Sequence, residues 1–202
     1  MFARANALKS ILRTVARPDV ARRSFSVISI HSTIPTILLR LQCQPQSALF
    51  DYAGKDPAEV DPEDGVTVAE DGLVYPKVSH DEPSLSSQNT NGVGMMPNTF
   101  LMQEIVRNTV DWYHEGLVDG LPLIYRVAKG APVPPRLILI QDRLSHFSLQ
   151  PSVPMPLDVL NQTLDSFYEK HAQRMTAEEW LDDHPFEEAV PTVDVTDLAH
   201  VP

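Results

Sequence analysis

The sequence predicts one α+β domain with tails on either side, and three observations carry this expectation. Three short apolar or alternating segments, typical of strands, follow one another between residues 121 and 150. An amphipathic helical pattern follows them directly, with apolar side chains at helical spacing between residues 157 and 168. The 202 residues include 18 prolines, which lie in turns and linkers, so compact structure is expected in only part of the chain.

The three central strands are expected at Leu123–Val127, Arg136–Gln141 and Ser145–Gln150. Turn residues around Gly130 separate the first from the second, and a polar break at Gln141–Arg143 separates the second from the third. Runs of five or six apolar or alternating residues are typical of strands with one or both faces covered. The amphipathic helix that follows would close this hydrophobic block.

The first 29 residues differ from the rest, with six basic residues and one acidic residue. Leu8, Leu12 and Val15 fall on one helical face with cations around them. An arginine-rich, acid-poor amphipathic segment is typical of a mitochondrial transit peptide, so we assign residues 1–29 to a leader and expect the protein in the mitochondrial matrix. The alternative is a surface helix or a basic arm that touches nucleic acid.

The remainder is strongly acidic: of the chain's 16 basic and 27 acidic residues it keeps 10 and 26, a net charge of −16. Such a body repels phosphate backbones, so we expect small-molecule or basic protein partners and no nucleic acid. No apolar run is long enough to span a membrane. A single cysteine, Cys43, and scattered histidines give no expected disulfide and no expected metal site.

A first strand is expected within residues 33–42, and it contains Arg40 inside an apolar run. An arginine in a strand is commonly a rim residue with its head in water. Alternatively, its guanidinium receives an anion such as a diphosphate.

Residues 44–70 are expected to form an acidic loop with at most a short helix near 57–60, followed by a short strand at Leu73–Pro76. The glycines of Gly92–Gly94 suggest a hinge. Asn98 suits the N-cap of a helix that ends near His114.

The domain is expected to span residues 30–173, with residues 174–202 as an acidic, largely disordered tail. Within that tail, Thr176 and Glu179 have the spacing of a capping box that opens a short helix through Trp180.

The most specific chemical feature is a triplet of polar side chains in the last central strand. Alternation places His146, Ser148 and Gln150 on one face. Polar groups in a row on an apolar sheet need solvent or a polar ligand. A lone strand histidine is otherwise a satisfied structural residue, and that alternative stays open.

These residues lie within a collinear resemblance to the type VI secretion toxin family of ADP-ribosyltransferase-like fold and to its relatives in fungi. The resemblance covers residues 36–172 and is carried by five segments: Leu39–Arg40, Glu70–Pro76, Met96–Asn98, Tyr125–Leu139 and Leu144–Met155. It implies two small twisted antiparallel sheets that form a cleft with flanking helices. It also implies NAD as the substrate, with transfer of ADP-ribose to a target, so the expected partners are NAD and a protein target or an immunity-type protein.

The resemblance further implies roles for individual residues. It makes Arg40 the anchor of the dinucleotide, Tyr75 or Phe147 the aromatic wall, and Ser148 a further contact to NAD. It also places Arg40, His146 and Gln150 in catalysis. Gln150 stands where most ADP-ribosyltransferases have a glutamate, so two hypotheses remain: an NAD-cleaving enzyme, or a non-catalytic binding module of the same fold.

Overall fold

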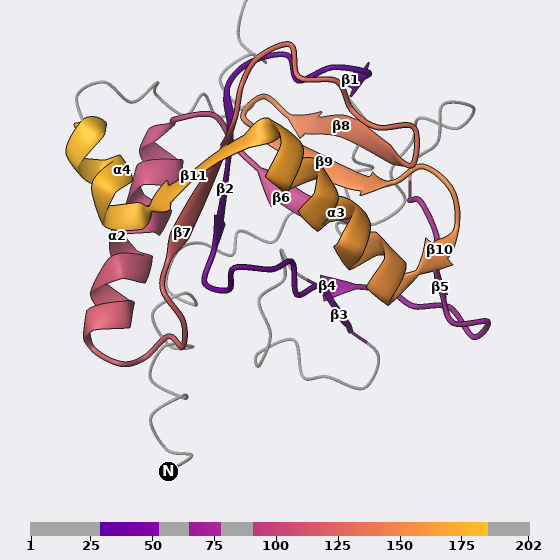
Figure 1. Ribbon diagram of the computed structural model, residues 1–202, viewed down its shortest axis with the longest axis horizontal. Helices are drawn as coiled ribbons and strands as arrows, with labels where there is room; N and C mark the ends of the chain where they lie inside the picture. The colour runs from indigo at the N-terminus through magenta and orange to yellow at the C-terminus, as the bar shows by residue number, and fades with distance from the viewer. Residues whose placement is uncertain (1–28, 53–64, 78–90, 186–202) are drawn as a thin grey trace, which may run out of the picture.

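The computed structural model describes residues 29–52, 65–77 and 91–185, which form a mixed α+β fold (Figure 1). Within these ranges, two larger antiparallel sheets and two minor strand pairs are flanked by three helices. The predicted fold class is therefore confirmed. Residues 1–28 of the leader predicted at 1–29, the short helix near 57–60 and the tail beyond residue 185 lie outside the described residues, whereas Ser29 is the first residue of β1.

The larger sheet is antiparallel and has four strands. Its order is β1 (Ser29–His31), β8 (Leu137–Arg143), β9 (His146–Pro151) and β6 (Val93–Met95). β8 and β9 form a hairpin, while β1 and β6 come from distant parts of the chain. Since Val93–Met95 is a strand that pairs with β9, the hinge expected at Gly92–Gly94 is corrected to a sheet edge.

The second sheet has the order β11 (Ala172–Thr176), β7 (Leu123–Val127) and β2 (Leu38–Gln42), and it is also antiparallel. The two minor pairs are β10 (Met155–Pro156) with β5 (Leu73–Val74), and β3 (Phe50–Asp51) with β4 (Gly65–Val66). The central strands were therefore placed correctly in the chain, but β7 lies in a different sheet from β8 and β9.

In the described part of the chain, one isolated β-bridge connects the two larger sheets. Leu39 of β2 and Met96, just after β6, exchange backbone hydrogen bonds of 2.7 and 3.0 Å. Both side chains lie in the same hydrophobic cluster, so they mark one face that runs across the junction. The neighbouring residues, Arg40 and Met95, point to the opposite face because side chains alternate along a strand.

That opposite face holds the main core and is covered by α3 (Leu157–His171). Leu160, Leu164 and Phe167 of α3 recur at helical spacing and are buried against apolar residues of both sheets. Burying one such side chain stabilises the fold by about 1.5–3 kcal/mol.

The other face of the three-stranded sheet is covered by α2 (Phe100–His114) and α4 (Ala177–Asp183). Trp180 of α4 is 0% exposed within this second cluster. The capping box of Thr176 and Glu179 is confirmed, with both of its hydrogen bonds present. Residues 172–183 thus belong to the packed domain, which extends beyond the expected boundary at residue 173.

The N-cap of α2 differs by one residue from the expectation. Thr99, and not Asn98, has the extended backbone of the cap, and its hydroxyl accepts a hydrogen bond from the Met102 amide at 3.1 Å. Asn98 instead accepts a hydrogen bond from Gln103 through its side chain. Both side chains can cap a helix, so the sequence alone favoured the wrong member of the pair.

Candidate functional site

The β8–β9 hairpin carries the polar triplet, and a bulge shapes its tip. Gln141 pairs with Phe147 and Arg143 pairs with His146, which leaves Asp142 as an extra residue on β8. A bulge of this kind redirects side chains near the end of a sheet. It places Asp142 on the same face as His146, Ser148 and Gln150.

His146 and Asp142 are in direct contact. The Nδ1 atom of His146 lies 2.5 Å from the Oδ1 atom of Asp142, and their side chains are 14% and 6% exposed. A carboxylate can only accept hydrogen bonds, so the contact requires the proton on Nδ1. The imidazole is therefore held in one orientation with its Nε2 atom unprotonated when the ring is neutral.

Ser148 and Gln150 lie deeper on this face and are fully buried. The side-chain oxygen of Gln150 accepts a hydrogen bond from the Lys77 amide at 3.2 Å. Gly92 approaches β9 so closely that a Cβ atom there would lie 2.8 Å from the Cβ of Gln150. These contacts fix the position of Gln150, while His146 is the member of the triplet that reaches the surface.

Phe147 lies on the opposite face of β9, in the main core. Its ring centroid is 5.8 Å from that of His31 on β1. The two faces of β9 therefore separate Phe147 from the triplet, as strand alternation predicts.

Arg40 also faces the main core. It lies in a cross-strand row with Tyr125 of β7 and Arg174 of β11, and it is only 6% exposed. The rim position considered from the sequence is thus not observed. Across the bridge of Leu39 and Met96, the Arg40 face continues into the Phe147 face, so the structure does not bring Arg40 together with His146 and Gln150.

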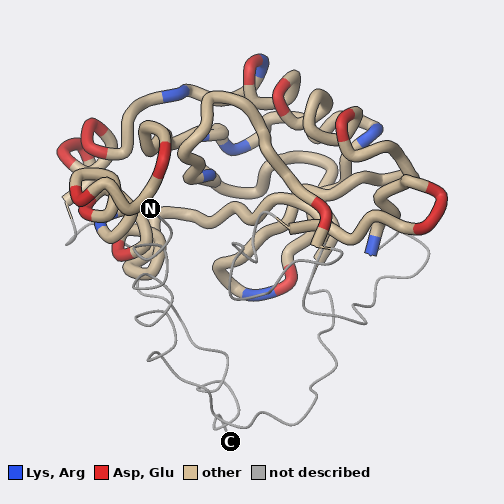
Figure 2. The backbone as a smooth tube through the Cα atoms, turned by 90° about the horizontal axis from the view of Figure 1, so that it is seen from below, with Lys and Arg blue, Asp and Glu red and all other residues tan. Residues whose placement is uncertain are grey.

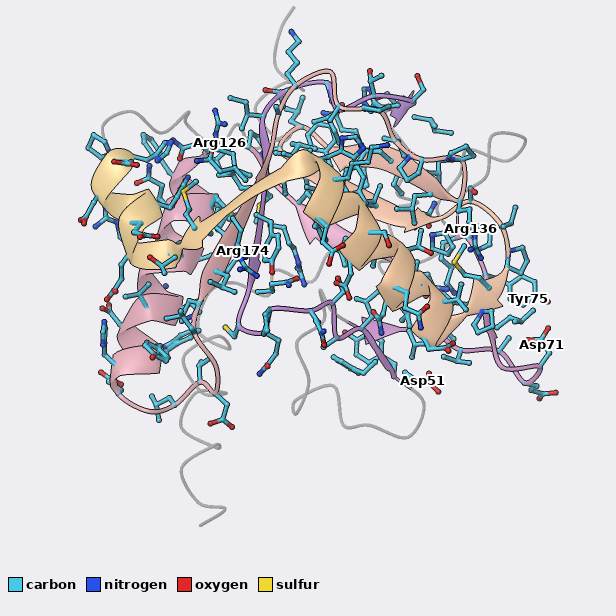
Figure 3. The ribbon with its side chains drawn as sticks, viewed as in Figure 1. Asp51, Asp71, Tyr75, Arg126, Arg136 and Arg174 are labelled. Carbon is cyan, nitrogen blue, oxygen red and sulfur yellow. The ribbon has the colours of Figure 1, made fainter. Side chains whose placement is uncertain are left out.

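Tyr75 lies at the far end of the molecule from this row (Figure 3). Tyr75 is 43% exposed, and its hydroxyl donates to the Asp71 carboxylate at 2.7 Å. This hydrogen bond raises the pKa of the Tyr75 hydroxyl above its ordinary value. Only the backbone of Tyr75 approaches the candidate site, where its carbonyl accepts from Asn91.

Two residues at the hairpin tip were missed by the sequence reasoning. For Asp142 and Arg143 the sequence predicts only a polar break between strands. The signal available was the four-residue spacing of Asp142 and His146 across a tight turn. Arg143 is cross-strand from His146, its side chain is 58% exposed, and its Nε atom lies 3.8 Å from Asp142.

A concave region lies between β11 and α4. It is an open hollow lined by Gln173, Met175, Glu179, Asp182 and Asp183. Figure 2 shows that acidic positions gather over this helical end of the molecule. The carboxylates that line it would repel an anion such as a pyrophosphate.

In the described part of the chain, no group of three histidine, cysteine or acidic side chains is arranged to hold a metal ion. Among the helices of residues 29–52, 65–77 and 91–185, none is both long enough and apolar enough to cross a membrane.

The sequence matches a known protein family. The family model described as Tse2 ADP-ribosyltransferase toxin matches residues 36–180, which is most of the chain. The matched segment begins before β2 and ends within α4, so it includes both larger sheets except β1. No curated protein matches the sequence.

Proposed function

Since the chain belongs to the Tse2 ADP-ribosyltransferase toxin family, we propose that it cleaves the nicotinamide–ribose bond of NAD and transfers ADP-ribose to a target or to water. Family membership implies NAD as the substrate. The observation that carries the proposed location is the polar row of β9, in which the part-buried His146 precedes the fully buried Ser148 and Gln150.

The reaction sets clear requirements for such a site. Breaking the bond between nicotinamide and ribose passes through a state in which the ribose resembles an oxocarbenium ion, as in glycoside hydrolysis. Hydrogen-bond acceptors or negative charge held near the ribose stabilise this state. A positive side chain is also needed for the pyrophosphate.

The hairpin supplies each of these groups within a few residues. His146 and the Asp142 carboxylate lie beside the proposed ribose position, and Ser148 and Gln150 form the floor beneath them. Arg143, cross-strand from His146 and mostly exposed, is placed to receive the pyrophosphate. Arg40, the anchor implied by the family resemblance, would have to act from the opposite face.

A comparison of the two arginines tests this arrangement. The full chain is incubated with NAD, and nicotinamide release is followed over a range of NAD concentrations. Arg143→Ala should raise KM roughly 10-fold to 100-fold, because a charge-assisted hydrogen bond contributes about 1.5–3 kcal/mol. Arg107→Ala, an exposed arginine on α2, is the matched control and should leave KM unchanged.

Arg40→Ala is measured in parallel, with folding checked by circular dichroism. If KM rises for folded Arg40→Ala and not for Arg143→Ala, the dinucleotide is bound by Arg40 of β2, and the proposed site at the hairpin is wrong. Absence of nicotinamide release from the wild-type chain would refute the NAD-cleaving function itself.

The second candidate is a non-catalytic binding module of the same fold. It is favoured by the lack of a glutamate on β9 and by the acidic hollow beside α4. The carboxylates there suit a basic protein partner, as a target or an immunity-type protein would provide. Salt-sensitive capture of such a partner by the wild type, lost in Glu179→Gln/Asp182→Asn, with no NAD turnover, would favour this function.

We also propose that the protein acts in the mitochondrial matrix, on the basis of the basic amphipathic composition of residues 1–29. Fusion of this segment to a fluorescent protein should direct the fusion to mitochondria. Replacement of its six basic residues by glutamine should abolish that import.

A further inference from the structure

The Asp142–His146 contact points to a specific role that rests on the proposed function. We propose that Asp142 positions His146 as the general base of the reaction, which takes the proton from the ADP-ribose acceptor, an O–H nucleophile such as water or an alcohol hydroxyl. The 2.5 Å contact between Nδ1 and Oδ1 is the observation that carries this inference.

The geometry gives each member of the pair one task. Asp142 is held on the bulge of β8 and is the more deeply buried partner, so its carboxylate faces the imidazole rather than solvent. It accepts the Nδ1 proton, which leaves the Nε2 lone pair of the neutral ring to accept another. The His146 side chain is 14% exposed, and a nucleophile would approach Nε2 through this exposed part of the ring.

The proton and electron changes then balance. As the bond between the nicotinamide nitrogen and C1′ of the ribose breaks, nicotinamide leaves with the bonding electron pair and becomes neutral. The oxygen of the acceptor forms the new bond to C1′, and its proton passes to Nε2 of His146. The resulting imidazolium is stabilised by the Asp142 carboxylate, which stays ionised, as in hydrolases that pair an aspartate with a histidine.

This arrangement also accounts for the missing glutamate on β9. The negative charge comes from β8 instead, and it acts on the reaction through the imidazole. Gln150 cannot supply that charge, and its side-chain oxygen is already bonded to the Lys77 amide.

The first test needs no substrate. Two-bond ¹⁵N–¹H NMR spectra of the full chain, recorded where the ring is neutral, should show His146 with its proton on Nδ1. In Asp142→Ala, the proton should move to Nε2, the position that free histidine favours. A wild-type ring protonated at Nε2 would overturn the positioning role of Asp142.

The second test measures nicotinamide release from NAD in the full chain. Asp142→Asn should lower kcat roughly 100-fold, with KM for NAD within about twofold of the wild type, because a general base contributes at least about that factor. Formate should restore activity to Asp142→Ala, and imidazole to His146→Ala, since each replaces the group that was removed. Asp111→Asn, an exposed aspartate on α2, is the control and should behave as the wild type.

A kcat of Asp142→Asn within threefold of the wild type, in a variant with a native circular dichroism spectrum, would overturn the catalytic part of the inference. The acceptor class is read from the products of reactions that contain methanol. Methyl ADP-ribose should form beside ADP-ribose, and the yield of both should fall together in Asp142→Asn. If the wild type releases no nicotinamide, the proposed function and this catalytic role both fail, while the tautomer measurement still decides whether Asp142 orients His146.

Discussion

Gly92 offers a sharp test of how closely β6 is packed onto the candidate site. A Cβ atom at this position would lie 2.3 Å from the Leu149 carbonyl oxygen and 2.7 Å from the Cα of Gln150. Ordinary contacts begin near 3.4 Å, and both of these neighbours are backbone atoms that cannot rotate away. Gly92→Ala therefore requires β6 and β9 to separate by about 1 Å, which a close-packed interior resists.

The expected cost follows from this displacement. Overpacking of a core costs about 1–3 kcal/mol, and we expect the upper end because backbone is displaced and the pairing of Val93 with Leu149 begins next to the substitution. A typical domain is stable by about 5–15 kcal/mol, so the variant should stay folded and measurable. Urea denaturation followed by circular dichroism gives the difference in unfolding free energy.

Gly116 provides the matched comparison, because its backbone conformation and not the space around it disfavours a side chain. Its φ is +67°, and a Cβ atom there would meet nothing within 4 Å. Gly116→Ala should cost about 1–2 kcal/mol through backbone strain, and Gly116→Asn should cost less, because asparagine tolerates the left-handed region. At Gly92 the order should reverse, with asparagine worse than alanine. The same order at both sites, or a cost below about 0.5 kcal/mol for Gly92→Ala, would refute the steric reasoning.

Three further predictions concern the supports of the site and the domain boundary. Asn91→Ala should lower the free energy of unfolding, measured by urea denaturation, by about 2–3 kcal/mol. The buried side chain makes two hydrogen bonds to backbone groups, and the residue has a φ of +52°. Asn91→Gly should lower it by less, because glycine adopts this φ without strain. Trp180→Ala should lower the free energy of unfolding by about 3–5 kcal/mol, because the side chain is fully buried. A loss below about 1 kcal/mol would mean that α4 does not unfold cooperatively with the rest of the domain. A hydrogen bond from the Thr176 amide lowers the pKa of the Glu179 carboxyl below its ordinary value of 4.5. The ionised carboxylate therefore stabilises the folded state above that value, and this contribution is lost as the pH falls through the pKa of the folded state. The difference in Tm between the wild type and Glu179→Gln should therefore shrink on acidification, and a constant difference would contradict this assignment.

The elements that could be predicted from the sequence are those that pack one face against the core. Leu137–Arg143, His146–Pro151 and Leu157–His171 alternate or repeat because their apolar side chains meet the main cluster. The shared face of the polar triplet followed from the same alternation. Strand alternation does not predict which strands pair: β7 precedes β8 in the chain but pairs with β2 and β11.

The elements that were missed depend on tertiary contacts. Val93–Met95 contains a glycine and is flanked by another, so local signals favour a hinge, yet close approach to β9 requires small residues there. Ala172–Thr176 is largely polar because it lies at a sheet edge. The pairing of Asp142 with His146 depends on a bulge, which no hydrophobic pattern reveals.

The sheet topology also has a consequence for the rate at which the molecule folds. Among the described antiparallel pairs, β8 with β9 is the one that joins neighbouring segments, whereas β1, β2 and β6 must each find partners from much later in the chain. Loops of that length close slowly, so the native state should be reached in milliseconds to seconds rather than microseconds. The hairpin that carries Asp142 and His146 is thus the piece best suited to form early, and the remaining strands assemble around it.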